Sequence, residues 1–96
     1  MSRSDILKIL REFKENHAED YGILLMGVFG SVARDQATEK SDVDIFLTTK
    51  TPDPFNIVHI KEALEEILLH HVDIVRLRDR MNPSLKNRIE KDAVYV

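Results

Sequence analysis

The sequence has no cysteine, which excludes disulfide bonds, zinc sites built on thiolates and a cysteine nucleophile. It also has no excess of basic residues, because 14 lysines and arginines face 17 aspartates and glutamates, for a formal net charge of -3 at pH 7. This balance argues against a dedicated nucleic-acid-binding protein and against a protein that binds anionic membranes. The longest apolar run, 23–29, is far too short to span a membrane, and the first residues lack the apolar stretch of a secretory signal. We therefore expect a cytoplasmic location.

The length and the remaining composition are those of one small globular domain. A chain of 96 residues fits a single domain over residues 1–96, with a core of modest size. Hydrophobic residues make up 43% of the sequence and charged residues 32%, which is ordinary for a globular protein. No internal repeat, low-complexity segment or linker interrupts the chain.

Apolar residues recur at regular spacing and predict alternating helices and strands. Helical spacing near the N-terminus predicts an amphipathic helix with Ser4 as its N-cap. Runs of β-branched and apolar residues predict strands, and Asp-Pro and Asn-Pro pairs predict helix starts. The predicted elements, in chain order, are a helix over 5–17, a strand over 23–29, a short helix over 31–35, a strand over 43–48, a helix that starts at Asp53-Pro54, a strand over 72–76 and a helix that starts at Asn82-Pro83.

The order of these elements predicts an α/β (α+β) fold with a small mixed β-sheet flanked by helices. The link between the first two strands is short, so we expect those strands to pair in an antiparallel manner. This pairing would bring Gly30-Ser31, at the end of the first strand, beside Asp42, at the start of the second. The apolar segment 94–96 is suited to docking on a neighbouring protein.

The most informative pattern joins Gly30-Ser31 to Asp42 and Asp44 across the ten residues 32–41. Strand alternation puts Asp42 and Asp44 on the same face, roughly 7 Å apart along the chain. Such carboxylates repel each other unless a cation lies between them, and their hard oxygens favour Mg²⁺, with Mn²⁺ as an alternative. A glycine-serine turn that enters a helix offers N–H groups to the phosphates of a nucleotide. Two metal ions about 4 Å apart would clamp the oxygens of a phosphoryl displacement.

A third carboxylate, Asp73, lies among β-branched residues in the predicted strand 72–76. An aspartate inside an apolar strand is costly unless it is paired or bound to a metal. Beside the strand of Asp42 and Asp44, Asp73 would be a third metal ligand and a candidate general base for an incoming hydroxyl. The alternative is a structural ion pair with Arg76 or Arg78.

Each part of the pattern also has a purely structural explanation. A Gly-Ser pair is commonly only a turn, and a Ser-Asp pair is commonly a loop or a helix cap. An Asp-x-Asp pair at the start of a strand often forms a solvated edge that blocks aggregation. The occurrence of all of these together, at this spacing and in this strand context, favours a phosphate and metal site.

The motifs Gly30-Ser31-x-Ala33-Arg34 and Ser41-Asp42-x-Asp44-Ile45 resemble the signature of the DNA polymerase β-type nucleotidyltransferase superfamily, and in particular its minimal nucleotidyltransferase (MNT) branch. The resemblance covers nearly the whole chain and implies the polymerase β-like palm fold. It implies transfer of a nucleoside monophosphate from an NTP, with release of pyrophosphate. Where family members often have a glycine after the arginine, this sequence has Asp35, a residue type that tolerates left-handed backbone.

The resemblance also assigns site residues. It implies that two Mg²⁺ ions are held by the catalytic carboxylates Asp42, Asp44 and Asp73. It implies that the nucleotide is bound by Gly30, Ser31, Arg34 and Ser41, with Arg34 acting as a phosphate contact or as a brace.

Finally, the resemblance implies a partner. MNT proteins are commonly encoded beside a helical HEPN-domain protein in toxin–antitoxin pairs, and some silence the toxin by adenylylating it. The expected function is therefore Mg²⁺-dependent transfer of AMP from ATP to a hydroxyl of a HEPN toxin. The alternatives are a non-catalytic module that masks its partner by contact, and transfer to a small molecule. Larger nucleotidyltransferases carry an added helical domain, so a partner protein or a second copy would complete the site here.

Three further features have no assigned role. His70-His71 is more typical of exposed groups at a helix C-terminus than of a metal site. The basic cluster over 76–80 is either a solvated loop or a contact for a partner or a polyphosphate. Tyr95 is either a packing residue or a partner contact.

Overall fold

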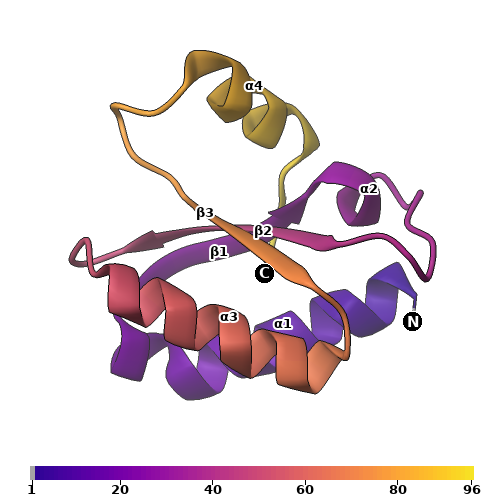
Figure 1. Cartoon of the computed structure of the whole chain (residues 1–96), viewed down its shortest axis with the longest axis horizontal. Helices are drawn as coiled ribbons and strands as arrows, with labels where there is room; N and C mark the ends of the chain where they lie inside the picture. Colours follow the sequence, from indigo (N-terminus) through magenta and orange to yellow (C-terminus); the bar gives the residue numbers. More distant parts are fainter. Residues whose placement is uncertain (1) are drawn as a thin grey trace.

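A four-stranded mixed sheet forms the centre of the structure, a computed structural model that describes residues 2–96 (Figure 1). Two long helices, α1 and α3, cover one face of this sheet, and α4 lies over the opposite face. None of the helices in the described residues is long and apolar enough to cross a membrane. The elements, in chain order, are α1 (Arg3–Tyr21), β1 (Ile23–Phe29), α2 (Gly30–Ala33), β2 (Val43–Thr49), α3 (Pro54–Leu68), β3 (Val72–Arg76), α4 (Pro83–Asp92) and β4 (Val94–Tyr95).

The strand order across the sheet is β3-β2-β1-β4. β1 pairs with β2 and with β4 in an antiparallel manner, and β2 pairs with β3 in a parallel manner. The predicted antiparallel pair and the small mixed sheet are therefore confirmed, and α3 supplies the crossover that a parallel pair requires. The predicted strands 23–29 and 72–76 agree residue for residue with β1 and β3, and β2 is one residue longer than predicted.

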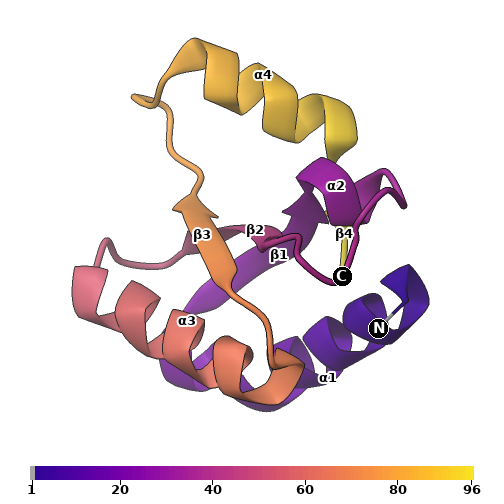
Figure 2. The same ribbon diagram turned by 45° about the vertical axis from the view of Figure 1, so that its right-hand side comes forward.

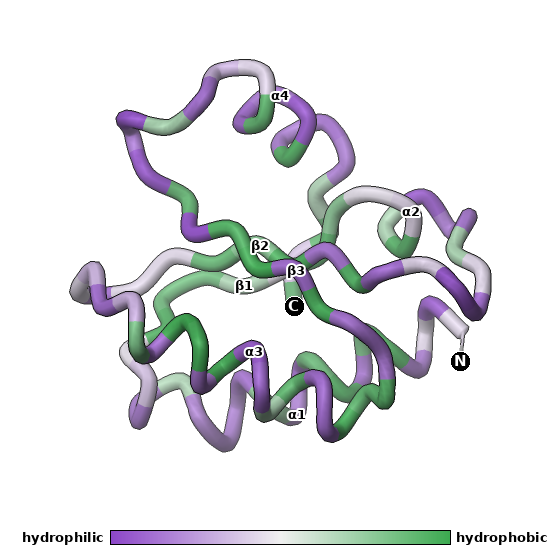
Figure 3. The backbone as a smooth tube through the Cα atoms, in the orientation of Figure 1, coloured by the Kyte–Doolittle hydropathy of each residue, from purple (hydrophilic) through white to green (hydrophobic). Residues whose placement is uncertain are grey.

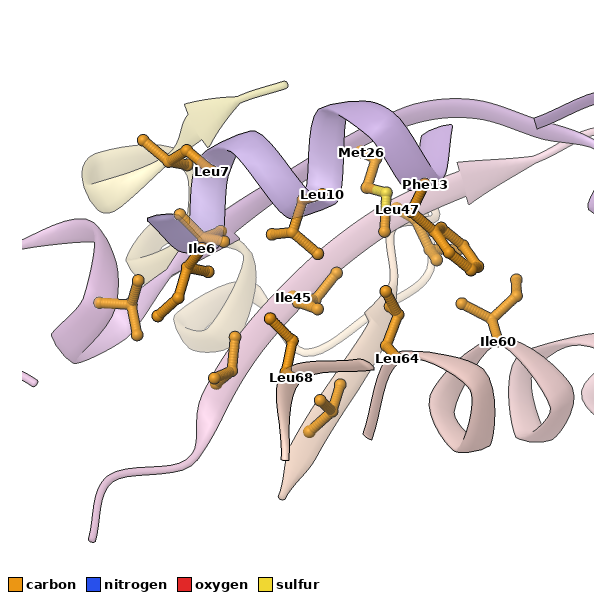
Figure 4. Packing of buried hydrophobic residues seen from close by; sticks show 14 of the residues in the cluster. Ile6, Leu7, Leu10, Phe13, Met26, Ile45, Leu47, Ile60, Leu64 and Leu68 are labelled. Carbon is orange, nitrogen blue, oxygen red and sulfur yellow. The ribbon is translucent and has the colours of Figure 1, made fainter. Parts of the chain in front are cut away.

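The main core lies between the sheet and the helices α1 and α3 (Figure 4). Its side chains come from one stripe of each helix and from alternate residues of the central strands, as the helical and strand periodicities require. Figure 3 shows this pattern as apolar residues that dominate β1 and β2 and alternate with polar residues along α1 and α3. The fully buried residues of this core include Leu10, Met26, Val28, Ile45, Leu47, Ile60, Leu64, Leu68 and Val72.

A second, smaller cluster holds α4 on the opposite face of the sheet (Figure 2). Ile89 of α4 is buried against Phe29 of β1 and Phe46 of β2, whose ring centroids lie 6.5 Å apart. Because this cluster is small, α4 is attached through few buried side chains, whereas α1 and α3 share the main core.

The helix starts follow the predicted caps with one exception. Asp53 and Asn82 cap α3 and α4, and each accepts two backbone N–H groups and precedes a proline. The predicted cap of α1 at Ser4 is wrong, because the helix begins earlier and its cap is Ser2. Ser2 and Asp5 form a capping box in which each side chain accepts the backbone N–H of the other, at 3.1 Å in both cases. This reciprocal pair satisfies two otherwise unused donors, which Ser4 would not do.

Within the segment 94–96, Val94 and Tyr95 form a fourth strand, β4, that the sequence pattern did not predict. Val94 and Tyr95 pair with β1 inside the chain. This segment thus covers the edge of β1 within the chain, and docking of 94–96 on a neighbouring protein stays a prediction. The Tyr95 ring also packs edge-on against Phe46, with centroids 5.2 Å apart.

We expect Gly27→Ala to destabilise the fold strongly, because a Cβ at this position would overlap the Phe46 ring and the backbone oxygen of Val94. That oxygen cannot move aside without separating β4 from β1, so the free energy of unfolding should fall by about 2–3 kcal/mol. Denaturant titration measures this change. Leu25→Ala, on the same strand, is the matched control, because it creates no clash and should cost about 1 kcal/mol or less. Equal losses from the two variants would contradict the close-approach explanation.

Candidate functional site

Two of the three predicted carboxylates lie side by side in the sheet. Asp44 of β2 and Asp73 of β3 are partners in the parallel register, so both side chains project from the same face. This is the face that α4 partly covers, because the neighbours of Asp44 along the strand, Val43 and Ile45, are buried in the main core. Asp42 lies two residues before Asp44, immediately ahead of β2. The fold therefore places Asp44 and Asp73 side by side at one end of one face, with Asp42 close enough for its charge to act on Asp44.

Asp44 lies in an electrostatically unfavourable position. Its side chain is half-buried, and this desolvation is the largest cause of a pKa raised above the usual value for aspartate. The negative charges of Asp73 and Asp42 raise the pKa of Asp44 further, and attraction to Arg88 and Arg34 offsets only part of this effect. The ionised form of Asp44 is thus held beside like charges that a cation would neutralise.

Asp73 is exposed to solvent at the start of β3. Among residues 2–96 it forms no ion pair, so the alternative of a structural pair with Arg76 or Arg78 is not realised. Its carboxylate is therefore open to a ligand.

Glycine is required at position 30, because the backbone there passes close to the Asp44 side chain. Phe29, the last residue of β1, pairs with Asp44 across the antiparallel ladder, so Gly30 follows directly beside this carboxylate. Gly30 has a φ of +70°, in the left-handed region, and a Cβ there would overlap Oδ2 of Asp44. The predicted convergence of the two halves of the motif is confirmed by this geometry.

Ser31 lies in a single helical turn, α2, which is shorter than the predicted helix 31–35. The first four N–H groups of any α-helix have no partner within the helix, and this holds for the N–H groups of this turn. Behind the turn, Asp35 has a φ of +58°. Aspartate therefore adopts the left-handed conformation expected where family members often have glycine.

Arg34 and Ser41, the other predicted nucleotide ligands, make contacts within the chain. Arg34 Nη1 donates to the carboxylate of Asp92 in α4 at 2.6 Å, and its Nε donates to Gln36 at 3.2 Å. Arg34 therefore acts as a brace between α2 and α4. Ser41 Oγ accepts the N–H of Thr38 at 2.9 Å and closes the loop that leads into β2. Contact of either residue with a nucleotide stays a prediction.

Arg88 of α4 is a basic residue near the site that the sequence pattern did not predict. Its positive charge lowers the pKa of Asp44, and the next residue, Ile89, anchors α4 in the second cluster. The sequence alone does not place Arg88 near the site. Helical spacing predicts which residues of α4 are buried, but it does not predict on which face of the sheet α4 packs.

The donor set fits a hard divalent cation. Three aspartates supply oxygen ligands, and the repulsion around Asp44 would be relieved by a bound cation. Within residues 2–96, no three His, Cys, Asp or Glu side chains are already gathered as a complete metal-binding group. Mg²⁺ does not require such a cage, because it is usually held by one or two carboxylates together with phosphates and water. Binding by Asp42, Asp44 and Asp73 remains a prediction.

The two histidines lie apart from this donor set, after the C-terminus of α3, as expected. The His71 side chain is 90% exposed and lies 3.5 Å from Glu65, while His70 contacts the Leu68 carbonyl at 2.9 Å.

Residues 6–96 match the nucleotidyltransferase domain family, which covers nearly the whole chain. The chain belongs to this family. It is accordingly an enzyme of the nucleotidyl-transfer class, and its fold, a mixed sheet flanked by helices, is the nucleotidyltransferase fold.

Relatives match this nucleotidyltransferase over almost its full length. A protein of Methanocaldococcus jannaschii, provisionally named protein adenylyltransferase MJ0128, is 38% identical over 94 residues, which cover 97% of this chain and 96% of the relative. The protein adenylyltransferase MntA of Thermococcus cleftensis is 31% identical over 97 residues, which cover 100% of this chain and 97% of the relative.

Solved structures share the fold of the nucleotidyltransferase. A protein provisionally named a minimal nucleotidyltransferase superposes with a TM-score of 0.82 at 31% identity, over 100% of this chain and 97% of the other, which confirms the resemblance to the MNT branch. A toxin–antitoxin structure with AMP-PNP matches with a TM-score of 0.72 at 23% identity, over 99% of this chain and 72% of the other. The complex of tri-AMPylated Shewanella oneidensis HEPN toxin with MNT antitoxin matches with a TM-score of 0.68 at 22% identity, over 99% and 71%. The last two matches show the shared fold.

We expect Asp44→Asn to stabilise the metal-free protein at neutral pH. A raised pKa in the folded state means that protonated Asp44 favours folding and that this contribution is lost as the pH rises through the folded pKa. A neutral asparagine removes the repulsion at pH 7, so the midpoint of thermal unfolding should rise by about 2–5 °C. The gain should shrink below the ordinary pKa of aspartate, where the wild type is also protonated.

Asp79→Asn is the matched control, because it removes the same charge from an exposed loop residue that is not among those that shift the pKa of Asp44. It should show no comparable gain in thermal stability. Identical melting curves for wild type and Asp44→Asn across the pH range would show that the carboxylate is not under electrostatic strain.

Proposed function

We propose that this protein is a Mg²⁺-dependent adenylyltransferase that moves AMP from ATP to a hydroxyl of a partner protein, and that the partner is a HEPN-domain toxin neutralised by this transfer. The observation that carries the proposal is the position of Asp44 and Asp73 in neighbouring register, directly beside the Gly30-Ser31 turn. A turn for phosphates and a set of carboxylates for metal ions are the parts that phosphoryl transfer requires.

Each motif residue has a role in this proposal. Asp42 and Asp44 would hold the divalent cations, Mg²⁺ or Mn²⁺, and Asp73 would complete their coordination. Two such ions, when bound, neutralise phosphate charge and make the α-phosphorus more open to attack. Gly30 and Ser31 would hold the triphosphate through the N–H groups of α2.

The proposed reaction exchanges one phosphorus–oxygen bond for another. The acceptor hydroxyl oxygen bonds to the α-phosphorus of ATP, the bond from that phosphorus to the bridging oxygen breaks, and pyrophosphate leaves. The hydroxyl proton must leave as the new bond forms, and Asp73, an exposed carboxylate beside Asp44, is the proposed base. Arg88 is placed to offset negative charge near Asp44.

The relatives support a protein acceptor and ATP as the donor. Both relatives are named protein adenylyltransferases. The fold is shared with an MNT antitoxin in complex with an AMPylated HEPN toxin, and with a toxin–antitoxin structure that holds AMP-PNP. The proposed use of ATP favours the cytoplasm as the location.

Transfer is tested with purified protein, Mg²⁺ and native cell extract, in parallel reactions with α-labelled and γ-labelled ATP. Label from the α-position alone should enter a protein band, because the AMP group retains only the α-phosphate. Asp44→Asn and Asp73→Asn should each reduce this labelling by about a hundredfold or more. Asp79→Asn, which removes a loop carboxylate, should retain full labelling.

Two other outcomes would overturn this proposal. A partner that co-purifies equally with wild type and Asp44→Asn, without label from either position, would establish masking by contact. Label that enters small hydroxylated compounds and no protein band would establish a small-molecule acceptor.

We expect Arg34→Gln and Asp92→Asn to differ in their effect on nucleotide binding. Both variants remove the 2.6 Å contact between these side chains, a partly exposed pair that should contribute about 1 kcal/mol or less to stability. Only Arg34→Gln removes a candidate phosphate ligand, so it alone should weaken binding of Mg²⁺ and a non-hydrolysable ATP analogue, by about tenfold. Isothermal titration calorimetry measures the affinity of each variant for the analogue in the presence of Mg²⁺. Equal losses of affinity would identify Arg34 as a brace and not a ligand.

A further inference from the structure

The outer edge of β3 is not paired with another strand in the described residues, because β3 is the first strand of the sheet order. In a parallel pair, alternate residues bond to the neighbouring strand. The carbonyl of His71 and the N–H of Leu77 bond to β2, so the backbone groups of Val72, Ile74 and Arg76 face outward. The N–H of Val72 is satisfied by Glu65 at 3.0 Å. Ile74 is therefore the centre of an open, hydrogen-bonding edge.

A groove of about 430 Å³ runs along this edge, between β3 and the start of α3. One wall is formed by Ile74 and Arg76 of β3, and the other is formed mainly by prolines and apolar side chains of the α3 start. Val58 in this wall is 49% exposed. An unpaired strand edge beside an apolar groove is the arrangement that binds an extended peptide as an added strand.

The charge of the groove specifies what kind of peptide fits. Arg76 and Arg78 both line it, and neither forms an ion pair within residues 2–96. Arg78 Nη1 donates a hydrogen bond to the backbone carbonyl of Arg76 at 3.4 Å. Two arginines without carboxylate partners at the end of an apolar groove fit a segment that carries both apolar and acidic residues.

We propose that an extended, acidic segment of the acceptor protein docks along the β3 edge and is guided by Arg76 and Arg78. This inference rests on the proposed function, because it concerns how the acceptor hydroxyl reaches the site. Arg76 lies three residues after Asp73 on the same strand, roughly 10 Å along it by standard strand rise.

Strand alternation connects the groove to the reacting group. Ile74 faces α3 and the groove, whereas Asp73 and Val75 face α4. A peptide strand paired with β3 would place alternate side chains on these same two faces. One set fills the groove and meets the arginines, and the other set presents a hydroxyl on the face of Asp73. Docking and reaction thus use opposite faces of one bound strand.

The test uses two synthetic peptides with the full-length protein, Mg²⁺ and ATP. In one peptide every second residue is valine or glutamate, so that one face of the extended chain carries both, and the residues between them are tyrosine, serine and threonine. The other peptide has lysine in place of each glutamate. Binding is measured by fluorescence anisotropy, and AMP transfer is measured by mass spectrometry. Wild type should prefer the glutamate peptide by roughly tenfold in both measurements. The Arg76→Glu/Arg78→Glu variant should reverse this preference, with its KM for ATP unchanged.

Arg78→Glu and Arg80→Glu form the matched control pair, because each reverses one nearby charge but only Arg78 lines the groove. Arg78→Glu should weaken the preference for glutamate, and Arg80→Glu should leave it intact. Circular dichroism melting confirms that each variant is folded.

The outcomes separate this inference from the proposed function. Charge-dependent binding without AMP transfer to any acceptor would support the docking edge and refute the transfer. Transfer to a protein that is insensitive to Arg76→Glu/Arg78→Glu would support the transfer and overturn the docking edge. The docking edge would also be overturned if neither peptide binds. It would likewise be overturned if light scattering shows that the wild type is a dimer and that the double variant is a monomer, because a second copy would then occupy the edge.

Discussion

The hydrogen-bonded register of β2 holds like-charged carboxylates together on one face of the sheet, and the geometry of the site depends on it. β2 is paired with a strand on each side. Its residue Asp44 lies opposite Phe29 of β1 and opposite Asp73 of β3. A slip of one residue would turn Asp44 toward α1 and α3 and would expose Ile45. The main core prevents this slip, because Val43, Ile45 and Leu47 of β2 are buried in it only in the observed register. Packing energy on one face therefore maintains electrostatic repulsion on the other.

The two faces of the sheet have different physical roles. The face under α1 and α3 is apolar and supplies most of the core. The face under α4 combines aromatic residues with the carboxylates, since Phe29 is both the cross-strand neighbour of Asp44 and part of the α4 cluster. This apolar neighbourhood lowers the local dielectric, which strengthens both the repulsion in the free protein and the attraction of a bound cation. Partial burial of Asp44 is thus a property of the site and not an incidental result of packing.

Much of the fold and of the motif geometry could be predicted from the sequence, because these features arise from local patterns. β1 and β3 have strong apolar runs with clear boundaries, and the short link before β2 leaves only an antiparallel pair. The start of α1 was wrong because Ser2 and Ser4 both can cap, and only the reciprocal bond to Asp5 distinguishes them.

Other features depend on contacts between distant segments, which local patterns do not contain. β4 has two residues and is defined only by its pairing with β1. The position of Arg88 depends on the face on which α4 packs. The pairing of Arg34 with Asp92 joins residues 58 positions apart, and no periodic pattern in the sequence predicts such a contact.

The contact between Arg34 and Asp92 also has a thermodynamic consequence. If Arg34 binds a phosphate, the nucleotide and the docked position of α4 compete for the same guanidinium. Binding of nucleotide at the α2 turn would then weaken the attachment of α4, which otherwise relies on a small apolar cluster. By linkage, any protein that draws α4 away from the sheet would raise the affinity for nucleotide by the same factor. The attachment of α4 to the sheet would in that case depend on whether a nucleotide is bound at the α2 turn, and a partner protein could detect that difference.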